Sequence, residues 1–207
     1  MGVLTKIKEN ELRNVLPKMK ENTFRDVLTK IREKAFRLHE EVNQRYGIYP
    51  YSTHLNMVGA IAWQYISFYE EKYHLPIMFG AYFHDTIEDA RLTYNDVMDI
   101  ARSYMGETSA YIATEIVYAL TNEKGRTRAE RANDKYYEGI RNTPFASFVK
   151  LCDRFANLKF SKETESKMHK KYISEWEHFI NSITNNDGVK EHSYPDIMVK
   201  NIVENYL

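Results

Sequence analysis

The stretch PIMFGAYFHDTIEDA, Pro76 to Ala90, joins a continuous apolar run to four groups that carry or bind charge. Its proline suits the first turn of a helix, and no strand-like alternation follows, so we predict a helix that runs through the charged groups. On that helix His84 stacks on Glu88 and Asp85 stacks on Asp89, because residues four apart share a face. Unpaired charge beside an apolar run is penalised by desolvation, so other segments must supply partners.

Helical periodicity extends over most of the chain, and alternating strand patterns are nearly absent. Thr93 and Asp96 form a capping box that predicts a helix start, and the Gly- and Pro-containing segment 45–54 predicts a loop. We expect further helices over 26–44, 54–73, 107–120, 128–137, 144–160 and 163–182. The fold class predicted from this pattern is all-α, a single helical bundle.

Composition excludes several classes of function. The 207 residues contain 29 basic and 29 acidic side chains, so no overall field would hold nucleic acid or an anionic membrane. No apolar stretch approaches the roughly 20 residues that a transmembrane helix needs. A single cysteine, Cys152, and an amphipathic start without an apolar leader favour a soluble protein of the reducing cytoplasm.

A 12-residue repeat occupies the N-terminus in three copies, 2–13, 14–25 and 26–37. Twelve residues rotate equivalent positions by about 120° on a helix, so no continuous apolar stripe builds up and a coiled coil is not predicted. Two interpretations stay open: short helices that pack on the body or on a second subunit, which would make a homo-oligomer, and a duplicated leader without function. We divide the chain into an extension at 1–25, a domain at 26–184 and a tail at 185–207.

Two further chemistry-bearing residues interrupt apolar sequence. His54 opens HLNMVGAIAWQYI, and Asp153 interrupts FVKLCDRFANL, whose apolar positions form a core-facing stripe. The remaining histidines have charged or polar neighbours and are expected to be solvated: His39, His74, His169, His178 and His192. A divalent ion would compensate buried carboxylates and use neutral imidazole as ligand, which makes His54, His84, Asp85 and Asp153 candidate metal ligands.

The pattern H…HD…D resembles the HD-domain metal phosphohydrolases. More specifically, the chain is similar to the hydrolase domain of RelA/SpoT-type alarmone enzymes and its small free-standing relatives, over residues 36–179. The motifs that carry the resemblance are RYGIYPYSTH (45–54), HDTIEDA (84–90), ALTNEK (119–124) and VKLCDRFANLK (149–159).

The resemblance implies one metal ion, usually manganese in this family, held by His54, His84, Asp85 and Asp153. Glu88 and Asp89 match the acidic pair that orients and activates the attacking water. This division agrees with the chemistry, because a divalent ion lowers the pKa of bound water and a nearby carboxylate can accept the proton.

Substrate contacts are also implied by the resemblance. Arg45 matches an arginine that stacks on the nucleotide base, and Asn157 matches an asparagine that contacts ribose or phosphate. Lys124 matches a lysine that reaches a phosphate, and Tyr172 matches a tyrosine near the ribose. The expected activity is hydrolysis of (p)ppGpp or a related alarmone, with release of pyrophosphate from the ribose 3′ oxygen.

Several positions depart from the family pattern. Leu55 replaces a proline, Ala90 a threonine, Tyr46 and Gly47 a lysine and a serine, and Ala156 a histidine or tyrosine. None of these replaces a predicted metal ligand or the acidic pair, so the departures bear on base preference and phosphate placement. Two alternatives stay open: a nucleotide phosphatase, such as one that removes the 2′-phosphate of NADPH, and a non-catalytic HD module that senses nucleotide.

Overall fold

The computed structural model describes residues 21–122, 126–184 and 193–207. Over these residues the chain is all-α, as predicted, with one two-stranded antiparallel hairpin of β1 (Arg45–Tyr46) and β2 (Tyr49–Pro50). The helices in chain order are α2 (Glu21–Glu41), α3 (Ser52–Tyr65), α4 (His74–Phe83), α5 (Tyr94–Arg102), α6 (Glu107–Leu120), α7 (Arg128–Arg131), α8 (Asp134–Asn142), α9 (Ala146–Glu163), α10 (Met168–Ser174), α11 (Trp176–Ile183) and α12 (Asp196–Tyr206).

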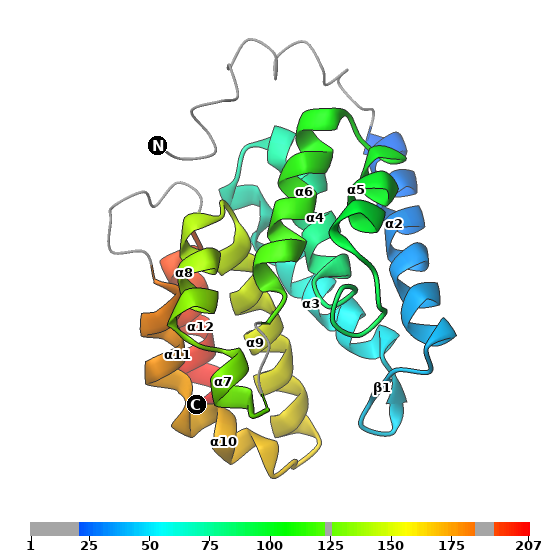
Figure 1. Cartoon of the computed structure of the whole chain (residues 1–207). Coiled ribbons are helices and arrows are strands. Elements are labelled where there is room, and N and C mark those ends of the chain that lie inside the picture. The colour runs from blue at the N-terminus through cyan, green and yellow to red at the C-terminus, as the bar shows by residue number, and fades with distance from the viewer. Residues whose placement is uncertain (1–20, 123–125, 185–192) are drawn as a thin grey trace.

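The middle of the bundle consists of α3, α4, α6 and α9, with α2 on one side and α8, α11 and α12 on the other (Figure 1). Helix α3 packs against both α4 and α9, and α4 packs against α2 and α6. Gly59 lets α3 approach α4 closely, because a Cβ atom there would lie 2.5 Å from the ring of Tyr82. This packing brings the N-terminal end of α3, the C-terminal end of α4 and the middle of α9 together.

Three sequence predictions are confirmed closely. The helix predicted over 107–120 is α6, with both ends in place. Thr93 and Asp96 form the predicted capping box of α5: the Asp96 carboxylate accepts the Thr93 N–H at 2.8 Å, and the Thr93 hydroxyl accepts the Asp96 N–H at 3.2 Å. The apolar stripe predicted on α9 is buried in the core as well: Phe148, Leu151, Phe155 and Leu158.

The helix predicted through the charged stretch was wrong at its end. Helix α4 ends at Phe83, and residues 84–89 form turns. The hydroxyl of Thr86 donates to the carbonyl oxygen of Phe83 at 2.7 Å, and the Thr86 N–H bonds to the same oxygen at 2.9 Å. A threonine hydroxyl that bonds to nearby backbone competes with the helix, so the backbone leaves helical geometry at this point.

The helix predicted over 54–73 was also too long. Helix α3 ends at Tyr65 and is followed by two 3₁₀ turns, η2 (Ile66–Phe68) and η3 (Glu71–Tyr73). Tyr69 and Tyr73 turn inward there and pack on Phe145, with ring centroids 5.6 and 4.8 Å away. Burial of these two rings favours the break over a continuous exposed helix.

Two other predicted helices are each divided. Residues 128–137 belong to α7 and α8, because the Asn133 side chain accepts the Tyr136 N–H at 3.0 Å and caps a new helix. Residues 163–182 belong mainly to α10 and α11, which meet at Glu175.

Of the two domain boundaries drawn from the sequence, the one at 25/26 lies inside a helix. Helix α2 spans the boundary at 25/26 without a break, while most of the first two repeat copies lies outside the described residues. Within the stretch assigned to the tail, α12 buries Met198 and Ile202 completely in the common core. Residues 193–207 therefore belong to the body of the bundle.

Candidate metal centre

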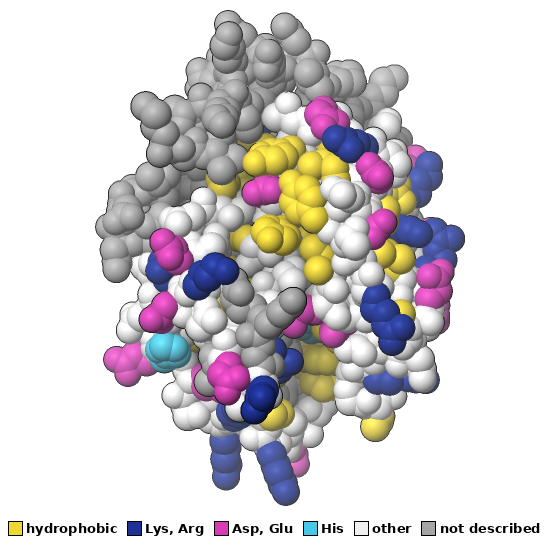
Figure 2. All heavy atoms as spheres, in the orientation of Figure 1, with side chains coloured by type: hydrophobic (Ala, Val, Ile, Leu, Met, Phe, Trp, Pro, Cys, Tyr) yellow, Lys and Arg dark blue, Asp and Glu magenta, His cyan; other side chains and the backbone are white. Residues whose placement is uncertain are grey.

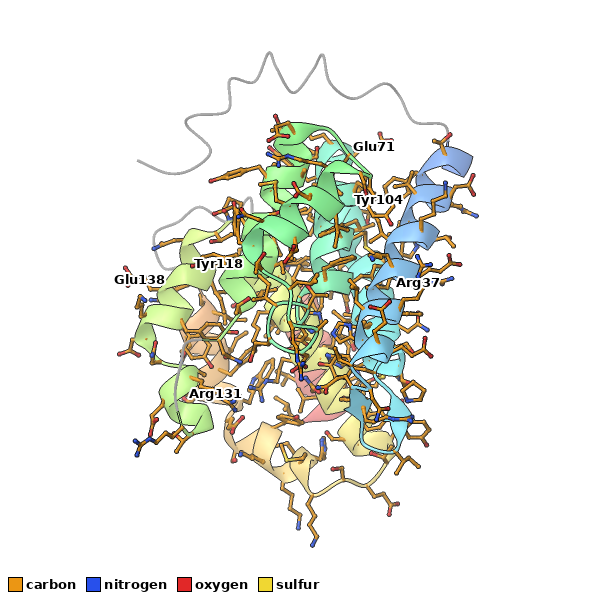
Figure 3. The ribbon with its side chains drawn as sticks, turned by 45° about the vertical axis from the view of Figure 1, so that its right-hand side comes forward. Arg37, Glu71, Tyr104, Tyr118, Arg131 and Glu138 are labelled. Carbon is orange, nitrogen blue, oxygen red and sulfur yellow. The ribbon has the colours of Figure 1, made fainter. Side chains whose placement is uncertain are left out.

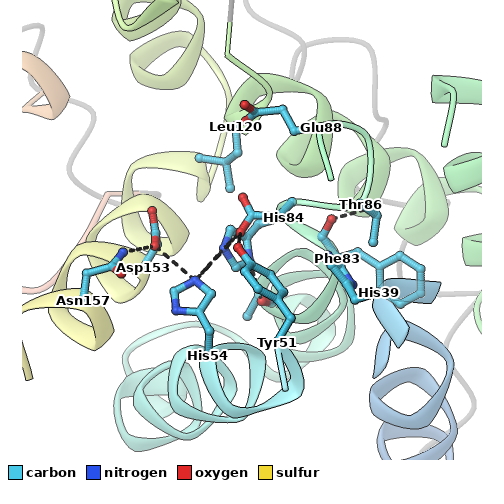
Figure 4. A network of polar contacts seen from close by, with 12 residues as sticks. His39, Tyr51, His54, Phe83, His84, Thr86, Glu88, Leu120, Asp153 and Asn157 are labelled. Carbon is cyan, nitrogen blue, oxygen red and sulfur yellow. Dashed lines mark hydrogen bonds and ion pairs between the residues drawn. The ribbon is translucent and has the colours of Figure 1, made fainter. Parts of the chain in front are cut away.

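Three segments distant in sequence bring their polar groups together at the junction of α3, α4 and α9 (Figure 4). His54 lies in the first turn of α3, and its Nε2 atom is 3.3 Å from Nε2 of His84, just past the end of α4. The same His54 atom is 3.3 Å from Oδ1 of Asp153 on α9. Oδ2 of Asp85 lies 2.8 Å from Nε2 of His84 and 3.8 Å from Nε2 of His54.

The donor atoms suit a divalent cation. Ligand atoms of His54, His84 and Asp153 all lie within 4.8 Å of one another, and both histidines are buried. Nδ1 of His84 bonds to the carbonyl oxygen of Ala81 at 3.0 Å, which leaves Nε2 with its lone pair toward the cluster when the imidazole is neutral. Two imidazoles with carboxylates favour transition metals such as manganese, iron or zinc. Asp85 completes the predicted set of four ligands at the edge of this group.

The pKa values of the clustered side chains depend on the charges of their neighbours as well as on burial. Burial alone would lower the pKa of His84, but the carboxylates of Asp85 and Asp153 raise it to about 9. Burial would raise the pKa of Asp153, but Lys150 and the two histidines hold it well below its usual range. A metal ion would have to displace the proton of His84, so ion binding at neutral pH would release a proton.

Hydrogen bonds from outside the cluster fix both carboxylates. The Asn157 amide donates to Oδ1 of Asp153 at 2.6 Å, and the hydroxyl of Tyr46 donates to the Asn157 side-chain oxygen at 2.9 Å. On the other side, the hydroxyl of Tyr51 donates to Oδ2 of Asp85. Asn157, predicted as a substrate contact, thus directs its amide to a predicted metal ligand.

His39 was expected to be solvated, and that prediction was wrong. Its side chain is only 1% exposed and stacks on the ring of Tyr51, with centroids 4.8 Å apart and planes 16° apart. Nδ1 of His39 bonds to the carbonyl oxygen of Ala35 at 2.9 Å. Burial lowers its pKa, so this histidine supports Tyr51 as a neutral ring.

The acidic pair does not share the helical face that the sequence predicted, because residues 84–89 form turns. Glu88 is exposed, and both of its carboxylate oxygens accept hydrogen bonds from Asn122, the amide bonds measuring 2.9 and 3.0 Å. Asp89 is half-buried, and its pKa is raised to about 6 by burial and by the charges of Asp85 and Glu88. A pKa raised toward neutrality suits Asp89 to accept a proton in a reaction at neutral pH.

A cavity of about 720 Å³ opens beside the cluster. Its lining includes His54, Asp85, Asp153 and the acidic pair, together with Asn157 and Tyr172. Arg45 is exposed on β1 and is not among the lining residues, whereas its neighbour Tyr46 is. The structure therefore does not bring Arg45 to the cavity, and Lys124 lies outside the described residues.

Sequence reasoning missed several residues of this site. Lys150 lies 3.1 Å from Oδ2 of Asp153, and its position three residues earlier on the same helix could have indicated the contact. Tyr46 and Tyr51 were visible in the quoted loop, but their contacts depend on how the hairpin folds back over α3. Asn122 reaches Glu88 from the end of α6, and no local pattern predicts that contact.

Neither a protein-family model nor a curated protein sequence matches the chain. Among the described residues, we find no helix with the length and apolar character to cross a membrane. Figure 2 shows Lys, Arg, Asp and Glu side chains interspersed over one face of the molecule, with hydrophobic side chains gathered over the upper part of α6. A functional assignment consequently depends on the residues of the site.

Proposed function

We propose that the protein is a manganese-dependent phosphohydrolase of the HD type that acts in the cytoplasm and removes pyrophosphate from the 3′ position of (p)ppGpp or a related alarmone. One observation supports this above all: His54, His84, Asp85 and Asp153 converge from three segments, and three of them, His54, Asp85 and Asp153, line a nucleotide-sized cavity together with Glu88 and Asp89. The two histidines and two aspartates would hold the ion.

A bound divalent ion would lower the pKa of water and polarise a phosphoryl oxygen. Asp89 would accept the proton of the attacking water, because burial and the neighbouring carboxylates raise its pKa to about 6. Glu88 would orient the water through a carboxylate that Asn122 already holds in one position. Asp153 and Asp85 stay ionised, since the pKa of each is lowered despite burial.

The charges around the cavity bear on a polyanionic substrate. Two lining cations are paired inside the protein: Lys150 with Asp153, and Arg154 with Glu175 at 3.1 Å. Arg131 of α7 lies at the same end of the bundle as α10, which carries Lys171 (Figures 1 and 3). Both line the cavity with exposed side chains, Lys171 at 4.0 Å from Glu175, and would provide positive charge for the phosphates.

The direct test is to incubate the full chain with Mn²⁺ and a panel of 3′-pyrophosphorylated guanosine and adenosine nucleotides and NADPH. We expect pyrophosphate from at least one alarmone, and no turnover after chelation of the metal. Asp89→Asn should abolish release, whereas Glu163→Gln, an exposed carboxylate of α9 beyond the cavity, should leave it unchanged. Orthophosphate as the product would overturn the proposal in favour of a nucleotide phosphatase. Nucleotide binding without turnover would favour a sensing module.

A further inference from the structure

Two tyrosines of the hairpin segment flank the buried histidine of α3. Tyr46 ends β1, and Tyr51 directly precedes α3. Their ring centroids lie 4.8 and 5.3 Å from the ring of His54, and the two tyrosine rings stand at 90° to each other. The segment therefore places two aromatic rings against a predicted metal ligand.

The two hydroxyl groups reach opposite carboxylates of the cluster. Tyr51 donates directly to Oδ2 of Asp85. Tyr46 donates at 2.9 Å to the side-chain oxygen of Asn157, whose amide donates at 2.6 Å to Oδ1 of Asp153. Both ends of the Asn157 side chain are thus engaged within the protein, and the orientation of its amide is fixed by these two partners.

Each ring is held by a neighbour outside the cluster. Tyr51 stacks on the buried ring of His39, which bonds to the backbone of α2. Tyr46 packs against Phe160 of α9, with ring centroids 4.3 Å apart. Rings locked in this way carry their hydroxyl groups at fixed positions, so the carboxylates that they contact lose rotational freedom before any ion binds.

We propose that Tyr46 and Tyr51 act as a tyrosine clamp: positioning residues that preset Asp153 and Asp85 for a divalent cation, with Asn157 as the link on one side. This inference rests on the metal centre of the proposed function. Asn157 would then support a metal ligand and not contact the substrate. Tyr46, which stands where the family pattern has a lysine, would have a structural role.

The clamp is tested by Mn²⁺ titration calorimetry on the full chain at fixed pH, with Tyr46→Phe, Tyr51→Phe and the double variant. Phenylalanine keeps each ring and removes only the hydroxyl. We expect each single variant to bind Mn²⁺ about tenfold more weakly, within the range typical of lost outer hydrogen bonds to metal ligands. The double variant should bind Mn²⁺ more weakly than either single variant, because the two hydroxyl groups act on different carboxylates.

Tyr69→Phe is the matched control. Tyr69 is a buried tyrosine whose hydroxyl donates at 2.6 Å to the Ser193 carbonyl oxygen and not to a predicted ligand or its support. Its Mn²⁺ affinity should equal that of the wild type. Asn157→Ala, measured without nucleotide, should match Tyr46→Phe, whereas a pure substrate contact would leave Mn²⁺ affinity unchanged.

Mn²⁺ binding by both clamp variants as tight as that of Tyr69→Phe would overturn the clamp. Thermal unfolding of the metal-free variants shows whether each is folded. If Tyr51→Phe does not fold, Tyr46→Phe, at the less buried of the two positions, decides the test. A wild-type chain that binds no Mn²⁺ would overturn the metal centre and the clamp together. Mn²⁺ binding without hydrolysis would overturn the proposed reaction alone, and the affinities would then still decide on the clamp.

Discussion

Replacement of Lys150 by methionine should destabilise the metal-free protein and strengthen its response to metal. Nζ of Lys150 lies 3.1 Å from Oδ2 of Asp153, and the two side chains are only 18% and 15% exposed. Burial would lower the pKa of Lys150, but Tyr136 and Asp153 raise it, so the ammonium group stays charged. Methionine is unbranched and only one atom shorter, and it removes the charge together with the hydrogen bond to Asp153.

The magnitude follows from the geometry. At this separation and an effective dielectric constant of about 20, the attraction is about 5 kcal/mol. Breaking a buried ion pair by removal of one partner costs about 3–5 kcal/mol. The nearby histidines compensate the charge of Asp153 in part, so we expect the free energy of unfolding to fall by about 3 kcal/mol. For a chain of this size that corresponds to a fall in Tm of about 6–12 °C. Urea and thermal unfolding in the presence of EDTA measure both quantities.

Lys159→Met is the control on the same helix. Lys159 pairs with Glu163 at 2.5 Å, but these side chains are 39% and 53% exposed, so the loss should stay near about 0.5 kcal/mol. Mn²⁺ should then raise the Tm of Lys150→Met by more than it raises that of the wild type, because the Lys150 ammonium group no longer repels the metal ion. Equal destabilisation by both variants, or an equal response to Mn²⁺, would refute this reasoning.

Three other predictions concern the site and the packing around it. Asp153→Ala should lower bound Mn²⁺ well below one equivalent, and elemental analysis showing full occupancy would remove Asp153 from the ligand set. Hydrolysis at saturating metal should slow as the pH falls below about 6, because Asp89 then takes up a proton and no longer accepts one; a rate profile flat from pH 5 to 7 would contradict its role as the base. Gly59→Ala should cost about 1–3 kcal/mol in urea unfolding, since its Cβ would overlap the Tyr82 ring, whereas Gly139→Ala, with open space on α8, should be neutral or stabilising.

Much of the fold was predictable because it depends on local pattern. The limits of α6, the cap at Thr93 and the buried stripe of α9 follow from side-chain periodicity and capping chemistry alone. The end of α3 depends on Tyr69, which packs on the distant Phe145, and the end of α4 depends on the hydroxyl of Thr86. A local sequence pattern does not show whether such a contact is stronger than helix propensity.

The candidate site divides in the same way. The sequence predicted that His54 and Asp153 interrupt apolar faces, and the structure places both beside His84. His39 was misjudged because its neighbours in sequence are polar on one side, although Ile31 and Ala35 precede it on the same helical face and are fully buried. Helical periodicity applied to the histidine itself would have predicted its burial.

The position of α9 against α3 also has a consequence for the order of events during synthesis. His54 belongs to the first third of the chain and Asp153 to the last third, so a growing chain displays one predicted ligand long before it makes the other. Until α9 docks, the early segments offer only part of the donor set and compete poorly for a metal ion. For the proposed metal centre, acquisition of the ion would then be a late event, and a chain that stalls before α9 would lack Asp153 to retain it.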